Sequence, residues 1–109
     1  MASHKDYLDF ILEQLSDLEE VTARAMMGEY ILYYRGRIVG GIYDDRLLVK
    51  PVKAAAALLP SAVLEPPYEG AKEMLRVDEV DDRAFLARLV RAMYDELPAP
   101  RAKKKRPTA

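Results

Sequence analysis

Three runs of β-forming residues, separated by two-residue turn signals, lie between residues 24 and 51. Residues 29–34 alternate tyrosine with aliphatic side chains, which is typical of a strand. Arg35–Gly36 and Asp44–Asp45 supply the turns, because glycine and aspartate favour tight bends. The pattern predicts one antiparallel meander with strands at residues 21–27, 29–34, 37–43 and 46–50, and with Gly28 freeing the backbone at the first bend.

Apolar residues at helical spacing predict a long helix before the meander and another near the end of the chain. The first is expected at residues 4–19, because Ser3 and Asp6 resemble a capping box. The second follows Asp78 or Asp81 as its N-cap. Its expected buried stripe is Phe85, Leu86, Leu89, Val90, Met93 and Leu97.

Prolines divide the segment between the meander and the last helix. Pro51 suits the first position of a short helix that continues through residues 54–59, and Pro60 ends that helix. Residues 62–68 contain two further prolines and are expected to form at most an edge strand. Residues 71–77 can add one short strand. The predicted fold is therefore α+β, with an antiparallel sheet of five or six strands, two long helices and one short helix.

The chain has 109 residues, which suffices for one small domain with a single core. It has no cysteine, so a disulfide or thiolate zinc site is excluded, and a reducing cytoplasm is expected. No run is long and apolar enough to span a membrane. Residues 1–98 hold 12 basic and 18 acidic side chains, a net charge of -6, which disfavours phosphate binding by this predicted domain.

Residues for catalysis or metal binding are sparse. His4 is the single histidine and is expected in a frayed N-terminus, where it could not supply an acid, a base and an orienting group. The pairs Asp44–Asp45 and Asp81–Asp82 match no calcium loop, so a turn and a helix cap explain them better. Gly40–Gly41 belongs to no phosphate loop and favours close packing or a bulge. We expect no enzyme activity, no cofactor and no metal.

Several short motifs resemble the TfoX/Sxy N-terminal domain family. They are the run Arg24-Ala25-Met26-Met27-Gly28, Tyr30, the turn at Gly36, the strand at residues 47–50, the pair Pro67–Tyr68, and Lys72. The resemblance covers residues 5–97. It implies a secretion-chaperone-like α+β fold and a regulatory role like that of the N-terminal half of competence regulators, which act through transcription. The longer members carry a C-terminal helical domain, which we do not expect in this chain.

Four of these residues form a candidate ligand site. Arg24 and Lys50 are expected to end neighbouring strands, where Tyr68 and Lys72 could join them to bind a small molecule or an anion. The alternative is a structural network with Glu29, Glu69 or Glu73, because perturbed charges are often structural.

The chain turns basic after residue 98, so we expect a domain at residues 1–98 and a disordered tail at residues 99–109. The tail's positive side chains are Arg101, Lys103, Lys104, Lys105 and Arg106. They could make weak, non-specific nucleic-acid contacts, fold onto the acidic stripe of the first helix, or act only as a solubilising end. The meander is apolar on both faces, so we also expect a protein partner, a homodimer being one form of it.

Overall fold

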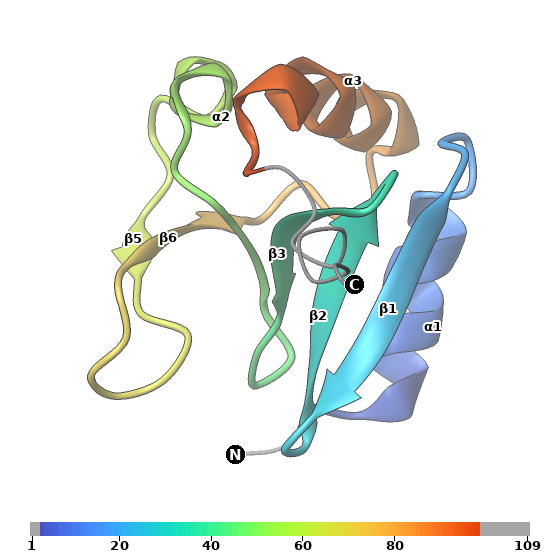
Figure 1. Ribbon diagram of the computed structural model, residues 1–109, viewed down its shortest axis with the longest axis vertical. Helices are drawn as coiled ribbons and strands as arrows, with labels where there is room; N and C mark the ends of the chain where they lie inside the picture. The colour runs from blue at the N-terminus through green and yellow to red at the C-terminus, as the bar shows by residue number, and fades with distance from the viewer. Residues whose placement is uncertain (1–2, 99–109) are drawn as a thin grey trace, which may run out of the picture.

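The computed structural model describes residues 3–98 and has an α+β fold (Figure 1). Six antiparallel strands form a sheet in the order β1-β2-β3-β4-β6-β5. The strands are β1 Val21–Met26, β2 Glu29–Tyr34, β3 Arg37–Ile42, β4 Leu47–Val49, β5 Leu64–Glu65 and β6 Met74–Val77. The helices are α1 Lys5–Gln14, α2 Lys53–Leu58 and α3 Arg83–Met93, followed by the short 3-10 helix η1 Tyr94–Glu96. The predicted fold class is confirmed.

Strands β1 to β4 form the predicted meander, and each begins and ends within one residue of the expected bounds. At all three turns both central residues have a positive φ, between 52° and 87°, which defines a type I′ turn. Such turns match the twist of the strands they join. The six turn residues are Met27, Gly28, Arg35, Gly36, Asp44 and Asp45.

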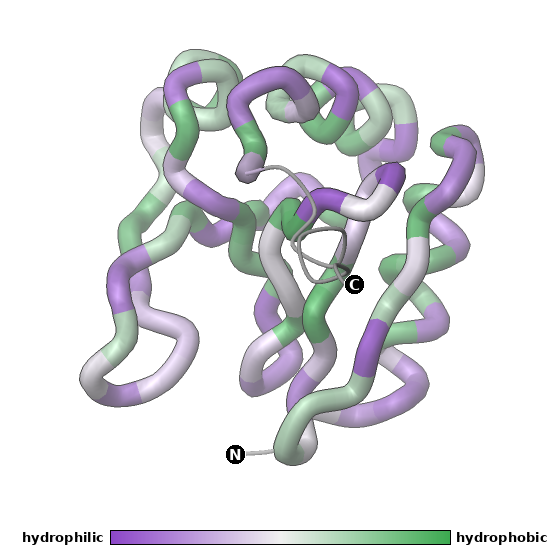
Figure 2. The backbone as a smooth tube through the Cα atoms, viewed as in Figure 1, coloured by the Kyte–Doolittle hydropathy of each residue, from purple (hydrophilic) through white to green (hydrophobic). Residues whose placement is uncertain are grey.

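Helices α1 and α3 bury their apolar stripes against one face of the sheet. Figure 1 shows α2 and α3 side by side at the end of the sheet where β2 ends, and Figure 2 shows hydrophobic and hydrophilic segments alternating along the chain. The largest fully buried side chains of this core are Ile11, Ile42, Leu86, Leu89, Met93 and Val49. Burial of each such side chain contributes about 1.5–3 kcal/mol, so this single core holds the two layers together.

Two predicted helix caps are wrong. Ser3 does not cap α1, because His4 occupies the N-cap position and the Ser3 hydroxyl donates to Glu29. The helix also ends at Gln14 rather than near residue 19. At α3 the cap is Asp82, whose carboxylate accepts the backbone N–H of Phe85 at 3.1 Å. Asp78 instead pairs with Arg76.

The segment between the meander and α3 follows the prediction with one correction. Pro51 does not open α2, because the helix starts at Lys53 with Val52 as its N-cap. The N–H of Lys50 still bonds to the carbonyl oxygen of Val39 at 2.9 Å, so the extended chain continues beyond β4. The expected edge strand is β5, and the expected further strand is β6. The predicted tail at residues 99–109 lies outside the described residues.

Candidate functional site

Strand β1 forms one edge of the sheet. A single hydrogen bond shows which of its residues direct their backbone N–H and C=O groups toward β2 and which direct them outward. The carbonyl oxygen of Glu20 accepts the N–H of Arg35 on the neighbouring strand at 2.9 Å. In an antiparallel pair, alternate residues bond to the neighbour and the residues between them point their N–H and C=O groups the other way. Thr22, Arg24 and Met26 therefore bond toward β2. The backbone groups of the outward-facing residues, Val21, Ala23 and Ala25, point away from the sheet.

The two edges of the sheet differ in how they are protected. Edge strand β5 has two residues and is followed by Pro66 and Pro67, and both features limit pairing with another chain. Strand β1 has six residues, no proline or lysine, and a single charge at Arg24. Its register with β2 is continuous, so no bulge turns it away. Strand β1 is thus the edge that can accept a further strand (Figure 1).

The hairpin tip next to β1 exposes two large apolar side chains. Met27 is 95% exposed and Met26 is 36% exposed. Met27 also has a φ of 52°, a region that costs a residue with a side chain about 1–3 kcal/mol. Its side chain recovers little of that cost within the domain, because almost none of its surface is buried. In Figure 2 this tip is coloured on the hydrophobic side of the scale.

The sheet face opposite the helices is covered at its centre by the chain itself. Leu48 pairs with Gly41 and Arg76, and its side chain is 0% exposed although it lies outside the main core cluster. The ring of Tyr43 lies over Gly41, where a Cβ would come within 2.6 Å of it, and Tyr68 packs on Tyr43 with ring centroids 6.4 Å apart. This confirms close packing at the glycine pair. The exposed large apolar side chains of the strands therefore lie toward the sheet ends rather than its centre.

The four predicted ligand residues are spread over the sheet. Arg24 is exposed in the middle of β1, whereas Lys50 follows β4, and strands β2 and β3 lie between them. The expectation that these two residues end neighbouring strands is wrong, because the meander keeps its sequential strand order. Tyr68 and Lys72 share the loop between β5 and β6. Ligand binding by the four residues stays a prediction.

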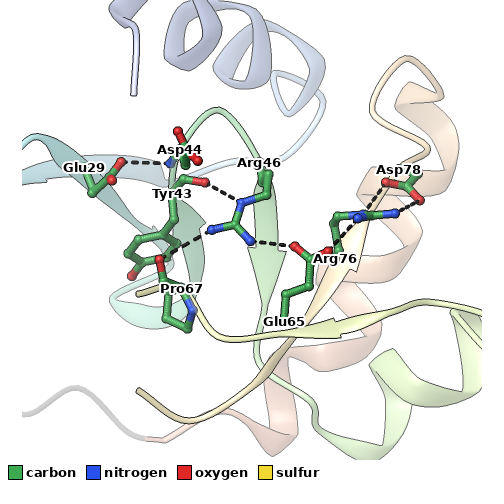
Figure 3. Close-up of polar contacts among 8 residues, drawn as sticks. All are labelled: Glu29, Tyr43, Asp44, Arg46, Glu65, Pro67, Arg76 and Asp78. Carbon is green, nitrogen blue, oxygen red and sulfur yellow. Dashed lines mark hydrogen bonds and ion pairs between the residues drawn. The ribbon is translucent and has the colours of Figure 1, made fainter. Parts of the chain in front are cut away.

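A charged network that sequence reasoning missed joins three strands on this second face (Figure 3). The Nη1 atom of Arg46 lies 2.5 Å from Glu65 Oε1, and Arg76 Nη1 lies 2.6 Å from Glu65 Oε2. Arg76 Nε also donates to Asp78 at 2.9 Å, while Arg46 Nε donates to the Tyr43 carbonyl oxygen at 3.0 Å. The hydrogen bond from Arg46 holds the pKa of Glu65 below its ordinary value, and the charge of Arg76 acts in the same direction.

Two arginines face two carboxylates in this network, so their charges balance and they leave no excess positive charge to bind an anion. The network instead attaches β5 and its proline-containing loop to β4 and β6. The sequence did contain one sign of this network: Arg76 is a charged residue within the otherwise apolar strand Met-Leu-Arg-Val.

A second network fastens the N-terminal residues to the turn between β3 and β4. His4 donates its backbone N–H to Asp45 at 2.8 Å, and its ring Nδ1 lies 2.6 Å from the same carboxylate. The Ser3 hydroxyl donates to Glu29 at 2.6 Å and accepts the Asp45 N–H at 3.1 Å. The expectation of a frayed N-terminus at His4 is therefore wrong. The ring hydrogen bond with Asp45 raises the pKa of His4, and the backbone N–H of His4, followed by its ring, lowers the pKa of Asp45.

Ser3, His4 and Asp45 are the residue types of a hydrolase triad, but their bonding is different. In a triad the histidine accepts the serine proton and the carboxylate orients the histidine. Here the Ser3 hydroxyl donates to Glu29, so the histidine has no nucleophile to activate. The arrangement ties two chain segments together.

Residues 3–98 contain no group of three or more His, Cys, Asp or Glu side chains suited to a metal ion. The core holds an apolar cavity of about 20 Å³, and an open cleft of about 360 Å³ lies beside β6. Neither cavity is lined by any of the four predicted ligand residues. Within the same described part of the chain, no helix has the length and apolar character required to cross a membrane.

The fold and its surface define a small α+β domain with one open strand edge. The family model of the TfoX N-terminal domain matches residues 13–97, so the chain belongs to the TfoX N-terminal domain family. This is not a known enzyme family. The chain is 33% identical over 105 residues to the "Uncharacterized 12.7 kDa protein in trpE 5'region" of Spirochaeta aurantia, which covers 95% of this chain and 91% of that protein. No solved structure gives a significant match.

Proposed function

We propose that this chain is a non-enzymatic module that works by binding another protein chain along strand β1. The observation that carries the proposal is the edge of β1, where three consecutive outward-facing residues present backbone N–H and C=O groups that no other residue between 3 and 98 binds. Adding a strand to an open sheet edge is a common mode of recognition, because the backbone bonds supply affinity and the side chains supply specificity.

The exposed tip supports the same proposal. Met27 and Met26 adjoin the open edge, and flexible methionine side chains adapt to the surface of a partner. A partner that covered Met27 would also recover the cost of its backbone conformation. The polar networks support the absence of catalysis, since each is closed by partners within the domain.

The regulatory part of the proposal rests on the family. Resemblance to the N-terminal half of competence regulators suggests that the bound protein acts in the control of transcription. The role is cytoplasmic on this proposal, consistent with a chain that has no cysteine to oxidise.

Site-specific photo-crosslinking in the native cell tests this function. A benzophenone side chain at Met27 should give an adduct of discrete mass, whereas the same group at Glu13, exposed on α1, should not. Adding Ala25→Pro removes an outward N–H from the edge and should abolish the Met27 adduct. Equal adducts at both positions, or a Met27 adduct that survives Ala25→Pro, would contradict docking on β1.

A further inference from the structure

We propose that the chain seated on β1 is a second copy of this protein, paired antiparallel through its own β1. This inference rests on the proposed function and names the partner. Two edges related by a two-fold axis are self-complementary, so every outward N–H of one copy can meet an outward C=O of the other.

The positions of the outward-facing residues select the register. With Ala23 opposite Ala23 of the second copy, Val21 lies opposite Ala25 of that copy, and the reverse pair completes the ladder. All three outward-facing residues of each copy are then bonded. Moving the copies by one bonded pair in either direction leaves at least one outward-facing residue without a partner on the other strand.

The charges favour the same register. A shift that placed Ala23 opposite Ala25 of the second copy would put the two Arg24 side chains directly opposite each other, and like charges there are destabilising. With Ala23 at the axis, Arg24 faces Thr22 of the second copy. The two Arg24 side chains are then diagonal neighbours rather than directly opposite each other, so their repulsion is weaker.

The side chains of the edge also suit close approach of two copies. Those of the outward-facing residues are two alanines and a valine, and Ala23 already packs against the core. In the proposed register Met26 and Met27 reach residues 19–20 of the second copy. The exposed tip of each copy thus gains a neighbour, which the isolated domain does not provide.

Net charge opposes the association only weakly. Residues 1–98 carry a net charge of -6, but the full chain carries -1, so the long-range repulsion between two copies is small. The backbone bonds of the ladder join uncharged groups, which salt does not screen. The dimer should therefore depend little on salt, unlike a dimer held by ion pairs.

Sedimentation equilibrium of the full chain at micromolar concentration provides the test. The parent and Ala25→Ser, which keeps the backbone N–H, should both be dimers. Ala25→Pro should weaken the dimer by about tenfold or more, because it removes one backbone donor from each copy. Ala25 is exposed, so Ala25→Pro should keep its thermal stability near that of the parent, which separates a lost interface from a lost fold.

Cysteine cross-linking reads the register independently, since the chain has no cysteine of its own. Ala23→Cys should form an intermolecular disulfide under mild oxidation, because a bonded pair at the axis has Cα atoms about 5.5 Å apart. Ala25→Cys should not, because its copies would lie roughly 13 Å apart along the strands. Preferential cross-linking of Ala25→Cys would overturn the proposed register.

A purely monomeric parent without Ala23→Cys cross-linking would overturn the second copy as partner. The proposed function would then stand only if the Met27 adduct in cells held a different protein and still required the N–H of Ala25. Absence of both results would overturn the partner and the function together.

Discussion

Arg46, which immediately precedes β4, donates to Glu65 in β5 across 2.5 Å, although 19 residues separate them in the chain. The same carboxylate accepts a bond from Arg76 in β6, which lies between β4 and β5 in the sheet. Glu65 thus connects the short edge strand to two strands further in. Since β5 itself has only two residues, this carboxylate supplies much of the polar attachment of that edge.

Replacing this carboxylate should loosen the β5 edge. Glu65→Gln should lower the free energy of unfolding by about 1 kcal/mol, because the amide keeps only one acceptor oxygen for two arginines and carries no charge, and the site is only 23% exposed. Urea melts of Glu65→Gln and of Glu69→Gln, an exposed carboxylate in the adjoining loop, provide the comparison. Equal stability of the two variants would contradict this role of Glu65.

The pKa of Glu65 also sets a direction for the effect of pH. Its folded-state pKa lies below the ordinary value of 4.5, so the folded state binds fewer protons than the unfolded state in this range. The contribution of Glu65 is complete above the unfolded pKa and is lost as pH falls through the folded pKa. Glu65→Gln should therefore lose less stability than the parent on acidification below about pH 4.5.

His4 should titrate above the ordinary value of 6.5, because Asp45 stabilises its charged form. The resulting stabilisation of the folded state is present below pH 6.5 and is lost as pH rises through the folded pKa. His4 is the single histidine of the chain, so the NMR signals of its ring can be followed through a pH titration without overlap from another histidine. Asp45→Asn should move the midpoint back toward 6.5, and an unchanged midpoint would mean that the ion pair does not form in solution.

Gly40 lies in β3 opposite Val49 of β4. A Cβ there would overlap the carbonyl oxygen of Leu48 and lie 2.7 Å from the Cα of Val49, and neither backbone atom can rotate away. Gly40→Ala should therefore cost about 2–3 kcal/mol in urea unfolding, the upper range for overpacking. Gly70→Ala is the matched control, since no atom lies within 4 Å of its added Cβ and only its φ of 89° opposes the change.

Met27 should limit the stability of the isolated domain. Asparagine before glycine is the preferred type I′ pair, so Met27→Asn should raise the free energy of unfolding by about 0.5–1 kcal/mol in the monomer. The same change removes the apolar tip and should weaken association, measured by sedimentation. A variant that is less stable than the parent would show that Met27 makes contacts within the domain that the structure does not contain.

The meander could be predicted because its information is local: each pair of turn residues stands between alternating strands. The polar contacts could not, because their partners are far apart in sequence. Ser3 and Asp6 match a capping box, yet Ser3 bonds to Glu29, 26 residues away. The helix predicted over residues 4–19 ends earlier in the structure, because the backbone of Leu15, with a φ of -97° and a ψ of 9°, leaves the helical region.

The candidate site shows the same limit. The sequence places Arg24 and Lys50 in strands but cannot say how many strands lie between them, and the sequential order of the meander separates them. The exposed state of Met27 was also not predictable, since methionine at this position fits a core as well as a surface. Strand β1 itself was predicted, whereas its place at the open edge required the sheet order.

Amide hydrogen exchange along β1, measured at increasing protein concentration, tests most directly whether this edge is the docking surface. In the dilute protein the amides of Thr22, Arg24 and Met26 should be protected by β2, and those of Val21, Ala23 and Ala25 should exchange freely. As copies associate, the second set should become protected while the first set changes little. Continued free exchange of Ala23 and Ala25 in fully associated protein would contradict the account.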